Sequence, residues 1–322
     1  MLPAADQLTI CFAHVAYQMQ ARFALRESGI ASFELRDRAA LDARIAKADV
    51  LVVSGLWHNG LAQLGGKLKF IQSIGAGTDQ FDRAALSAKG IRLASAAGVN
   101  ARAVSEHAMS LILALARRLP EARDNQARRF WRGMIGDLAG REDELTDKTL
   151  VIVGLGRIGG RLAQLAKAFD MRVIGVRRDP AGGRGAADEV HALSALPGLL
   201  PAADFVALTC PLTPETTNLI DAKALASMQR SAYLVNCARG RVVDEPALVA
   251  ALQAGTIAGA GIDVTWEEPL PADSPLWDAP NAFITPHTAG ETRCYEDNVI
   301  DILMENLSRQ WRSEMALLNQ VV

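Results

Sequence analysis

The sequence predicts an α/β protein of two domains, each built around a mostly parallel sheet. Three observations support that class: the length of 322 residues, an ordinary globular composition, and short apolar runs that alternate with amphipathic stretches. A typical domain takes about 100–200 residues, so this length favours two. Half of the residues are hydrophobic and 22% are charged, which leaves enough apolar material for two cores.

The first hundred residues alternate between expected strands and expected helices. The strands are brief runs rich in Ile, Leu and Val, at 8–12, 50–53, 69–73 and 91–94, and amphipathic stretches at 16–26 and 40–47 separate them. Strands that alternate with helices form a parallel sheet, because each crossover helix covers one face of the sheet.

The pattern then changes to a long helix at 100–118, where Val104, Ala108, Leu111 and Leu115 share one face. The segment 121–141 is polar but contains Phe130, Trp131 and Met134, and it indicates helix and loop. A second α/β run follows. Its expected strands are 149–153, 172–176, 205–208, 233–236, 259–263 and 282–285, its expected helices are 160–169, 221–227 and 246–254, and a last helix is expected at 292–312.

Charge and cysteine usage exclude several classes of function. The formal net charge is −2, so no global field attracts nucleic acid or an anionic membrane. The 4 cysteines form no CxxC pair, so we expect no zinc site, no other metal and no disulfide framework. The first ten residues lack a basic stretch and a long apolar run, which favours a cytoplasmic protein without a secretory signal or a membrane anchor.

A glycine-rich motif marks a dinucleotide site. Gly154, Gly156 and Gly159, with Arg157 and Ile158 between them, follow an apolar strand and open an apolar-periodic helix. Glycine allows the tight turn at the first position, the close approach of a pyrophosphate at the second and helix–strand packing at the third. The N-terminus of the helix then offers N–H groups and a positive dipole end to the phosphates. We therefore expect a Rossmann-like domain.

The residue that follows the next strand bears on the choice of cofactor. NAD-binding sites place an acidic residue there, about 20 residues after the glycines, to hold the ribose 2′-hydroxyl. This chain has Arg177 and Arg178 at that point. A guanidinium suits a 2′-phosphate, so we favour NADP over NAD. The alternative is that both arginines are solvated and Asp179 reaches back to the ribose.

Three separated segments supply a cation, a carboxylate and an imidazole. Arg239, Glu268 and His287 each follow an expected strand, and open α/β sheets place ligands at the carboxyl ends of their strands. When a carbonyl is reduced, a proton must reach its oxygen, and a histidine titrates near neutral pH. A carboxylate beside the ring favours the imidazolium, and an arginine binds a carboxylate in a forked geometry.

These motifs resemble those of the D-isomer-specific 2-hydroxyacid dehydrogenase family, which includes glyoxylate/hydroxypyruvate reductases. The resemblance extends over essentially the whole chain and is carried by GLGRIG, LTCPLTPETTNLI, NCARGRVVDE, GIDVTWEEPLP and ITPHTAG. It implies that Arg239 binds the carboxylate and carbonyl of the substrate. It also implies that Glu268 pairs with His287, which acts as the general acid and base.

The resemblance extends to binding residues. Asp263 is expected to contact the nicotinamide amide and Val104 to pack on the ring. The loop 73–79 is expected to hold the substrate carboxylate through backbone N–H groups, with Gly75, Ala76 and Gly77 as contacts; its other interpretation is a tight turn. The remaining expected cofactor contacts are Cys210, Pro211, Thr216, Cys237, Ala238, His287 and Ala289.

The resemblance also implies a domain arrangement. A cofactor domain, 100–288, is inserted into a substrate domain formed by 1–99 and 289–322, and both are expected to be Rossmann-like or flavodoxin-like domains with parallel sheets. The family pairs through its cofactor domains, so we expect a homodimer with the segment around Trp131 at its interface. Three departures stand out: Cys210 where the family commonly has histidine, Asp147 where it usually has glycine, and Arg177 in place of an acid.

We expect hydride transfer between NAD(P)H and a small 2-oxo acid, giving a D-2-hydroxy acid, with glyoxylate or hydroxypyruvate as substrate. Alternatives are a dehydrogenase of the same family that acts on phosphoglycerate or phosphite, a dinucleotide-sensing corepressor and an inactive scaffold. Trp57, His58 and Asn59 are weaker candidates for the substrate pocket, and a structural role is expected for His107.

Overall fold

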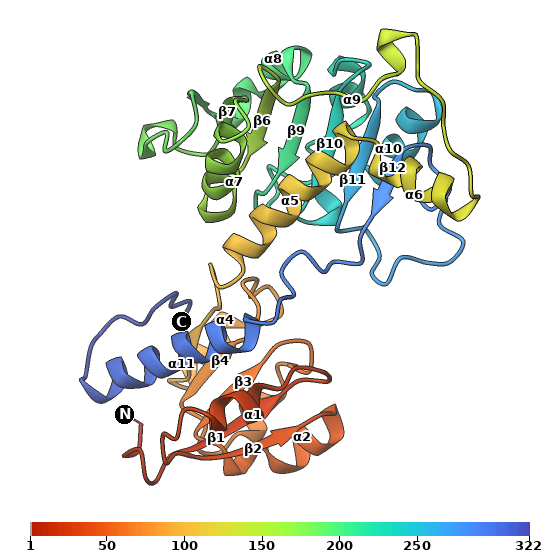
Figure 1. The fold of residues 1–322 in the computed structure, drawn as a ribbon. Coiled ribbons are helices and arrows are strands. Elements are labelled where there is room, and N and C mark those ends of the chain that lie inside the picture. Colours follow the sequence, from red (N-terminus) through yellow and green to blue (C-terminus); the bar gives the residue numbers. More distant parts are fainter. Residues whose placement is uncertain (1) are drawn as a thin grey trace. The chain divides into compact units, whose positions relative to one another are not determined.

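The computed structural model describes residues 2–322. The chain divides into two compact units (Figure 1). The first unit contains the described residues up to Asn100 together with Thr292–Val322, and the second unit contains Ala101–Glu291. The first unit is therefore made from both ends of the chain. The predicted fold class, α/β with two parallel sheets, is confirmed.

The sheet of the first unit has five parallel strands in the order β2-β1-β3-β4-β5. The 2-1-3-4-5 order is that of flavodoxin-like sheets. The strands are β1 (Thr9–Ala13), β2 (Ala31–Leu35), β3 (Val50–Val53), β4 (Phe70–Ser73) and β5 (Arg92–Ala94).

Helices cover both faces of this sheet. Alternate residues of a strand point to opposite faces, so Ile10 and Phe12 pack with one helix layer while Cys11 and Ala13 pack with the other. The first layer is α1 (Met19–Ala24) with α11 (Tyr295–Trp311), and the second is α2 (Arg38–Arg44), α3 (Leu61–Leu64) and α4 (Arg83–Ala88).

The C-terminal residues pair with the edge strand β5. The N–H of Val321 donates to the carbonyl of Leu93 at 2.8 Å, and an antiparallel bridge joins Ala94 to Gln320. The unpaired edge of β5 is thereby covered by the chain's own backbone, which is one way to protect a sheet edge.

The sheet of the second unit has seven parallel strands in the order β12-β11-β10-β9-β6-β7-β8. The direction of the strand order reverses between β6 and β9, which is where dinucleotide-binding sheets place their ligand. The strands are β6 (Thr149–Val153), β7 (Arg172–Val176), β8 (Glu189–His191), β9 (Phe205–Leu208), β10 (Tyr233–Asn236), β11 (Gly259–Ile262) and β12 (Ala282–Ile284).

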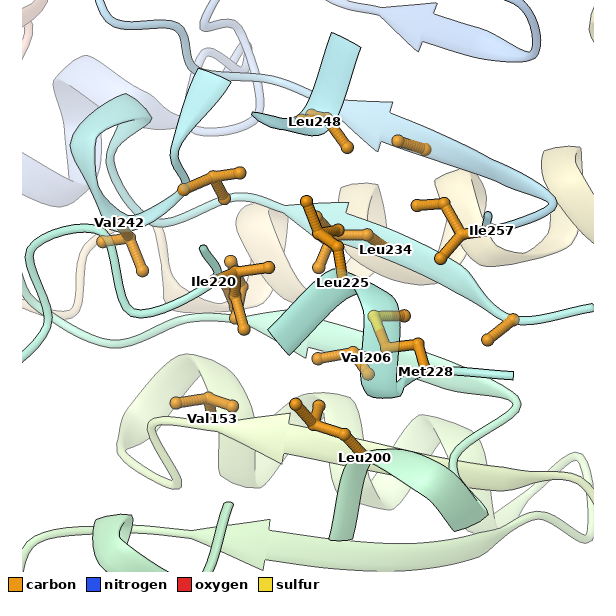
Figure 2. Close-up of a cluster of buried hydrophobic side chains, with 14 of the residues drawn as sticks. Val153, Leu200, Val206, Ile220, Leu225, Met228, Leu234, Val242, Leu248 and Ile257 are labelled. Carbon is orange, nitrogen blue, oxygen red and sulfur yellow. The ribbon is translucent and has the colours of Figure 1, made fainter. Parts of the chain in front are cut away.

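Two apolar layers sandwich this sheet. Leu150 and Ile152 pack with α5 (Ala101–Ala116) and α7 (Arg157–Lys167) on one face. On the other face, Val153, Val206 and Leu234 pack with α8 (Leu196–Leu199), α9 (Ala222–Ser227) and α10 (Glu245–Gln253); Figure 2 shows this cluster. Helix α6 (Leu119–Ala127) is different, because none of its described side chains is buried.

The expected strands are all present, and two more exist. The unpredicted strands β2 and β8 lie at sheet edges, where side chains are half-exposed and the apolar signal is weak. Helix α7 begins at Arg157 rather than at 160, because Gly156 is its N-cap and the helix starts within the glycine motif. Within residues 2–322, no helix is long and apolar enough to cross a membrane, and no His/Cys/Asp/Glu cluster suits a metal ion.

Candidate active site

The predicted site segments of the second unit follow strands that lie side by side. Parallel strands end at the same edge of a sheet, so the residues after β6, β9, β10, β11 and β12 share one edge. Those residues begin the glycine motif, the Cys210 loop, the Arg239 loop, the Asp263 segment and the His287 loop. The sheet order therefore brings most of the predicted residues to one side of the second unit.

The glycine motif has the geometry of a phosphate cradle. Gly154 has a φ of 104°, and a Cβ on it would lie 2.5 Å from the backbone nitrogen of Cys210. A Cβ on Gly159 would lie 2.3 Å from the carbonyl oxygen of Gly154. At Gly156, by contrast, no described residue apart from its two chain neighbours has an atom within 4 Å of that position.

Arg157 and Ile158 open α7 immediately after this glycine. The first turn of an α-helix has N–H groups without intrahelical acceptors, and its dipole favours an anion. With open space beside Gly156 and the start of α7 next to it, the motif fits a pyrophosphate group.

The two arginines after β7 differ in their burial and in their hydrogen bonds. Arg177 is half-buried, and its Nη1 donates to the carbonyl oxygens of Gly182 and Gly183, each at 3.1 Å. Arg178 is exposed. The carboxylate of Asp179 accepts the N–H of Ala181 at 3.0 Å and so caps the next turn. These contacts give the carboxylate of Asp179 a local structural partner.

The loop after β9 is closed by a threonine. Thr216 Oγ1 donates to the carbonyl oxygen of Pro211 at 2.8 Å and accepts the N–H of Thr213 at 2.7 Å. Cys210 is buried, and burial raises the pKa of its thiol to about 11. Thr216 is itself buried, so it shapes the loop, while Pro211 is exposed.

Hydrogen bonds from Asn236, the last residue of β10, stabilise the Arg239 loop. Asn236, which is 1% exposed, donates to the carbonyl oxygen of Arg239 at 3.1 Å and accepts the N–H of Ala238 at 3.0 Å. The Arg239 side chain is exposed. A Cβ on Gly240 would lie 1.9 Å from the carbonyl oxygen of Thr265, so this loop packs directly on the segment that leads to Glu268. Cys237 is buried, which raises the pKa of its thiol.

His287 and Glu268 form a hydrogen-bonded pair. Nδ1 of His287 lies 2.7 Å from Oε2 of Glu268, and Oε1 of that glutamate accepts the N–H of Thr265 at 3.1 Å. The two side chains are 47% and 36% exposed, so a substrate can reach them. The backbone of His287 has a φ of 54°, a left-handed conformation that is uncommon for a side chain other than glycine. This arrangement can hold and deliver one proton.

Asp263 is 2% exposed and faces the His287 loop. Its Oδ1 accepts from Thr285 Oγ1 at 2.7 Å and from the N–H of Thr288 at 3.1 Å, and its Oδ2 accepts the N–H of Ala289 at 3.2 Å. His107 Nε2 lies 3.0 Å from Thr285 Oγ1. Thr285 was not among the predicted functional residues, although its position two residues before His287 could have drawn attention to it.

Val104 is buried in the same helix, α5, one turn before His107. It belongs to the apolar cluster that also contains Cys237 and Ala289. Three predicted cofactor contacts, from α5, the end of β10 and the loop after β12, therefore share one cluster.

The predicted substrate loop lies in the first unit, after the inner strand β4. Gly75 and Gly77 are half-buried and Ala76 is exposed. The carbonyl oxygen of Gly75 accepts from Ser73 Oγ at 3.1 Å and from the N–H of Ala96 at 3.0 Å. The loop backbone is therefore anchored through a carbonyl, which leaves its exposed portion at Ala76.

The weaker candidates of the first unit have structural partners. Asn59 Oδ1 accepts from Trp57 Nε1 and from the N–H of Asp82, each at 3.0 Å. His58 Nε2 lies 2.6 Å from Asp42 Oδ1. These contacts stabilise the loop after β3.

An apolar surface lies outside the site. Phe130, Trp131 and Met134 are 60%, 93% and 104% exposed, and Leu138 is 75% exposed. We call these four residues the arm surface. They follow the exposed helix α6, and Phe130 and Trp131 help to line a pocket of about 480 Å³ against that helix.

Comparisons with known proteins agree with this geometry. The family model for "D-isomer specific 2-hydroxyacid dehydrogenase, NAD binding domain" matches residues 109–289. A glyoxylate/hydroxypyruvate reductase B of Yersinia pestis is 40% identical over 273 residues, which cover 81% of this chain and 82% of the relative. A D-3-phosphoglycerate dehydrogenase of Methanocaldococcus jannaschii is 38% identical over 278 residues, 85% of this chain and 52% of that relative.

The chain spans about half the length of the phosphoglycerate dehydrogenases that it matches. Among solved structures, an NADPH-dependent glyoxylate/hydroxypyruvate reductase from Sinorhizobium meliloti, in complex with NADP and malonate, superposes with a TM-score of 0.79 at 28% identity. That superposition covers 98% of this chain and 97% of the other. By its sheet order, its glycine motif and these matches, the chain belongs to the D-isomer-specific 2-hydroxyacid dehydrogenase family.

Proposed function

We propose that this protein transfers hydride between NAD(P)H and a small 2-oxo acid, forming a D-2-hydroxy acid, with glyoxylate or hydroxypyruvate as substrate. The observation that carries the proposal is the 2.7 Å contact between His287 Nδ1 and Glu268 Oε2. It lies at the sheet edge that also bears Arg239 and the glycine motif. The similarity to glyoxylate/hydroxypyruvate reductases supports the same conclusion.

The proton comes from His287. Its Nδ1 is taken by Glu268, so Nε2 is the nitrogen that donates to the carbonyl oxygen during reduction. The carboxylate of Glu268 stabilises the imidazolium and fixes the orientation of the ring. A bound reduced nicotinamide supplies the hydride for the carbonyl carbon. In the reverse direction, the neutral ring of His287 accepts the hydroxyl proton.

The substrate carboxylate is held by cationic and backbone groups. Arg239 is exposed at the same edge, and its guanidinium binds a carboxylate while it polarises the adjacent carbonyl. In the first unit, the backbone N–H groups of Gly75, Ala76 and Gly77 are proposed to bind a substrate carboxylate.

The second unit holds the cofactor in this proposal. The glycine motif and the start of α7 bind the pyrophosphate. Arg177 and Arg178 bind the adenosine end and favour NADP, since the exposed guanidinium of Arg178 suits a 2′-phosphate. The loop from Cys210 to Thr216 covers the cofactor. The nicotinamide end is bounded by Val104, Cys237, Ala238, Asp263 and Ala289.

The arm surface is proposed to join two copies of the chain in a homodimer. Large exposed apolar side chains that lie close together in the sequence are typical of an interface, and here four of them follow a helix whose described side chains are all at least partly exposed. The cytoplasm is the proposed compartment. Its support is that all four cysteines are free thiols, three of them buried, as expected in a reducing environment.

The test is a screen of NADH and NADPH oxidation with glyoxylate, hydroxypyruvate, pyruvate and 3-phosphohydroxypyruvate. We expect turnover with glyoxylate or hydroxypyruvate, a loss of most turnover in His287→Ala, and retained cofactor binding in that variant. Activity confined to the phosphorylated acid would instead favour the second candidate, a phosphoglycerate dehydrogenase, which the 38% identical relatives support. A His287→Ala variant as active as the wild type would refute the mechanism.

A further inference from the structure

Three polar groups from three separate elements meet behind the His287 loop. His107 lies in α5, Asp263 follows β11, and Thr285 follows β12. Thr285 Oγ1 lies 2.7 Å from Asp263 Oδ1 and 3.0 Å from His107 Nε2. The side chains of His107 and Asp263 are 21% and 2% exposed, so the contacts are largely shielded from water.

The donor and the acceptor of each hydrogen bond between His107, Thr285 and Asp263 can be assigned from the chemistry of the three side chains. Asp263 accepts the N–H groups of Thr288 and Ala289, as a carboxylate does. The single proton of the Thr285 hydroxyl therefore goes to Asp263, and the hydroxyl oxygen is left to accept. It follows that His107 donates from Nε2. The Thr285 hydroxyl then donates one hydrogen bond and accepts one, and each partner comes from a different element.

These hydrogen bonds fix the two ends of the five-residue loop 285–289. Thr285 is bound at the start and Thr288 and Ala289 are bound at the end, all to Asp263. His287 lies between them with a φ of 54°, and its N–H donates to the carbonyl oxygen of Thr285 at 3.0 Å. A residue other than glycine keeps a positive φ only where the surrounding structure enforces it.

We propose that Thr285 is a positioning residue for His287, and that His107 supports it as the second hydrogen-bond partner of the hydroxyl. The inference rests on the proposed function, in which the ring of His287 exchanges the proton. Without the hydroxyl, the start of the loop loses its attachment to Asp263 while the end keeps its two N–H bonds. The ring then no longer meets Glu268 at a fixed distance.

The test compares Thr285→Val, which removes the hydroxyl and keeps the shape, with Thr285→Ser, which restores the hydroxyl. We expect Thr285→Val to lower kcat roughly 100-fold while KM and the cofactor Kd change less than about threefold. Thr285→Ser should return kcat to within about threefold of the wild type, because the hydroxyl alone carries the effect. The control is Thr256→Val, the same exchange at a half-buried threonine before the amino end of β11, which should leave kcat unchanged.

A second readout is independent of turnover. Long-range ¹H–¹⁵N spectra of the five histidine rings, assigned with His107→Gln and His287→Ala, report which ring nitrogen carries a proton. We expect a protonated Nε2 on His107 in the wild type. The ring signals of His287 should shift in Thr285→Val and be restored in Thr285→Ser.

Wild-type turnover in Thr285→Val, or equal impairment in Thr285→Ser, would overturn the positioning role and leave the proposed function intact. If the wild type reduces none of the acids, the proposed function fails, and the positioning role of Thr285 is then tested by the spectra alone. Unchanged His287 signals in Thr285→Val would then overturn the positioning role, and shifted signals would support it.

Discussion

Arg177 Nη1 donates to the carbonyl oxygen of Gly182 across 3.1 Å, which folds the segment after β7 back on itself. The exposed guanidinium of Arg178 is then the one presented to solvent at this strand end. We expect Arg178→Ala to raise the KM for NADPH about 10- to 100-fold, because a charge-assisted contact to the 2′-phosphate is lost. The KM for NADH should stay within about threefold.

The matched control for this cofactor prediction is Arg184→Ala, which removes an exposed arginine from the same segment. Steady-state kinetics give the KM for NADPH and for NADH in the wild type, Arg178→Ala and Arg184→Ala. A wild-type enzyme that prefers NADH tenfold or more would contradict the preference for NADP.

Glu268 accepts from two groups, His287 and the N–H of Thr265. Glu268→Gln keeps the size of the side chain but removes the charge that stabilises an imidazolium. We expect kcat to fall roughly 100- to 1000-fold with an unchanged cofactor Kd, measured by quenching of protein fluorescence. Glu267→Gln, at the adjacent exposed carboxylate, serves as the control and should have wild-type kcat. Equal losses in both variants would point to a disturbed loop rather than to a lost charge.

Met134 and Met315 are 104% and 94% exposed, and only the first belongs to the arm surface. We expect Met134→Asp to halve the mass measured by sedimentation velocity, because a charge buried in an apolar interface is costly. Met315→Asp should sediment as the wild type does. The proposed dimer is wrong if the wild type sediments as a monomer at micromolar concentration.

Three of the four thiols are shielded by burial. It raises the pKa of Cys11 to about 12 and that of Cys210 to about 11, and it also raises the pKa of Cys237, so none forms much thiolate at pH 8. Cys294 is exposed. Mass spectrometry after iodoacetamide treatment at pH 8 should show one adduct on the native chain and none on Cys294→Ser. Labelling of Cys237 in the folded protein would contradict this burial.

The inner strands could all be predicted from the sequence, whereas two of the four edge strands, β2 and β8, could not. Val50–Val53 is buried at every position, so its apolar run is continuous and easily recognised. Ala31–Leu35 is half-exposed for most of its length, and Glu189–His191 is only three residues long and half-exposed throughout. A strand of that kind is defined by its neighbour in the sheet, which local sequence does not reveal.

The same holds for the site: residues in short motifs could be predicted from the sequence, whereas contacts between distant residues could not. Gly154, Arg239 and His287 belong to short motifs whose residue types and spacing already suggest their chemistry. The contact between His107 and Thr285 joins residues that are far apart in the sequence, and neither has an unusual local pattern. Likewise, the engagement of Arg177 with Gly182 depends on how the intervening turn folds.

The discontinuous first unit has a consequence for biosynthesis. Its helix α11 supplies Val299 and Leu303 to the apolar cluster that also contains Phe12 of β1. A ribosome that adds 5–20 residues per second needs roughly 10–40 s to pass from Asn100 to Thr292, and the strands made first lack that covering helix throughout. The second unit is contiguous and can complete its core during this interval. We therefore infer that the second unit completes its core before the first unit does, since the helix that covers the earliest strands is made last.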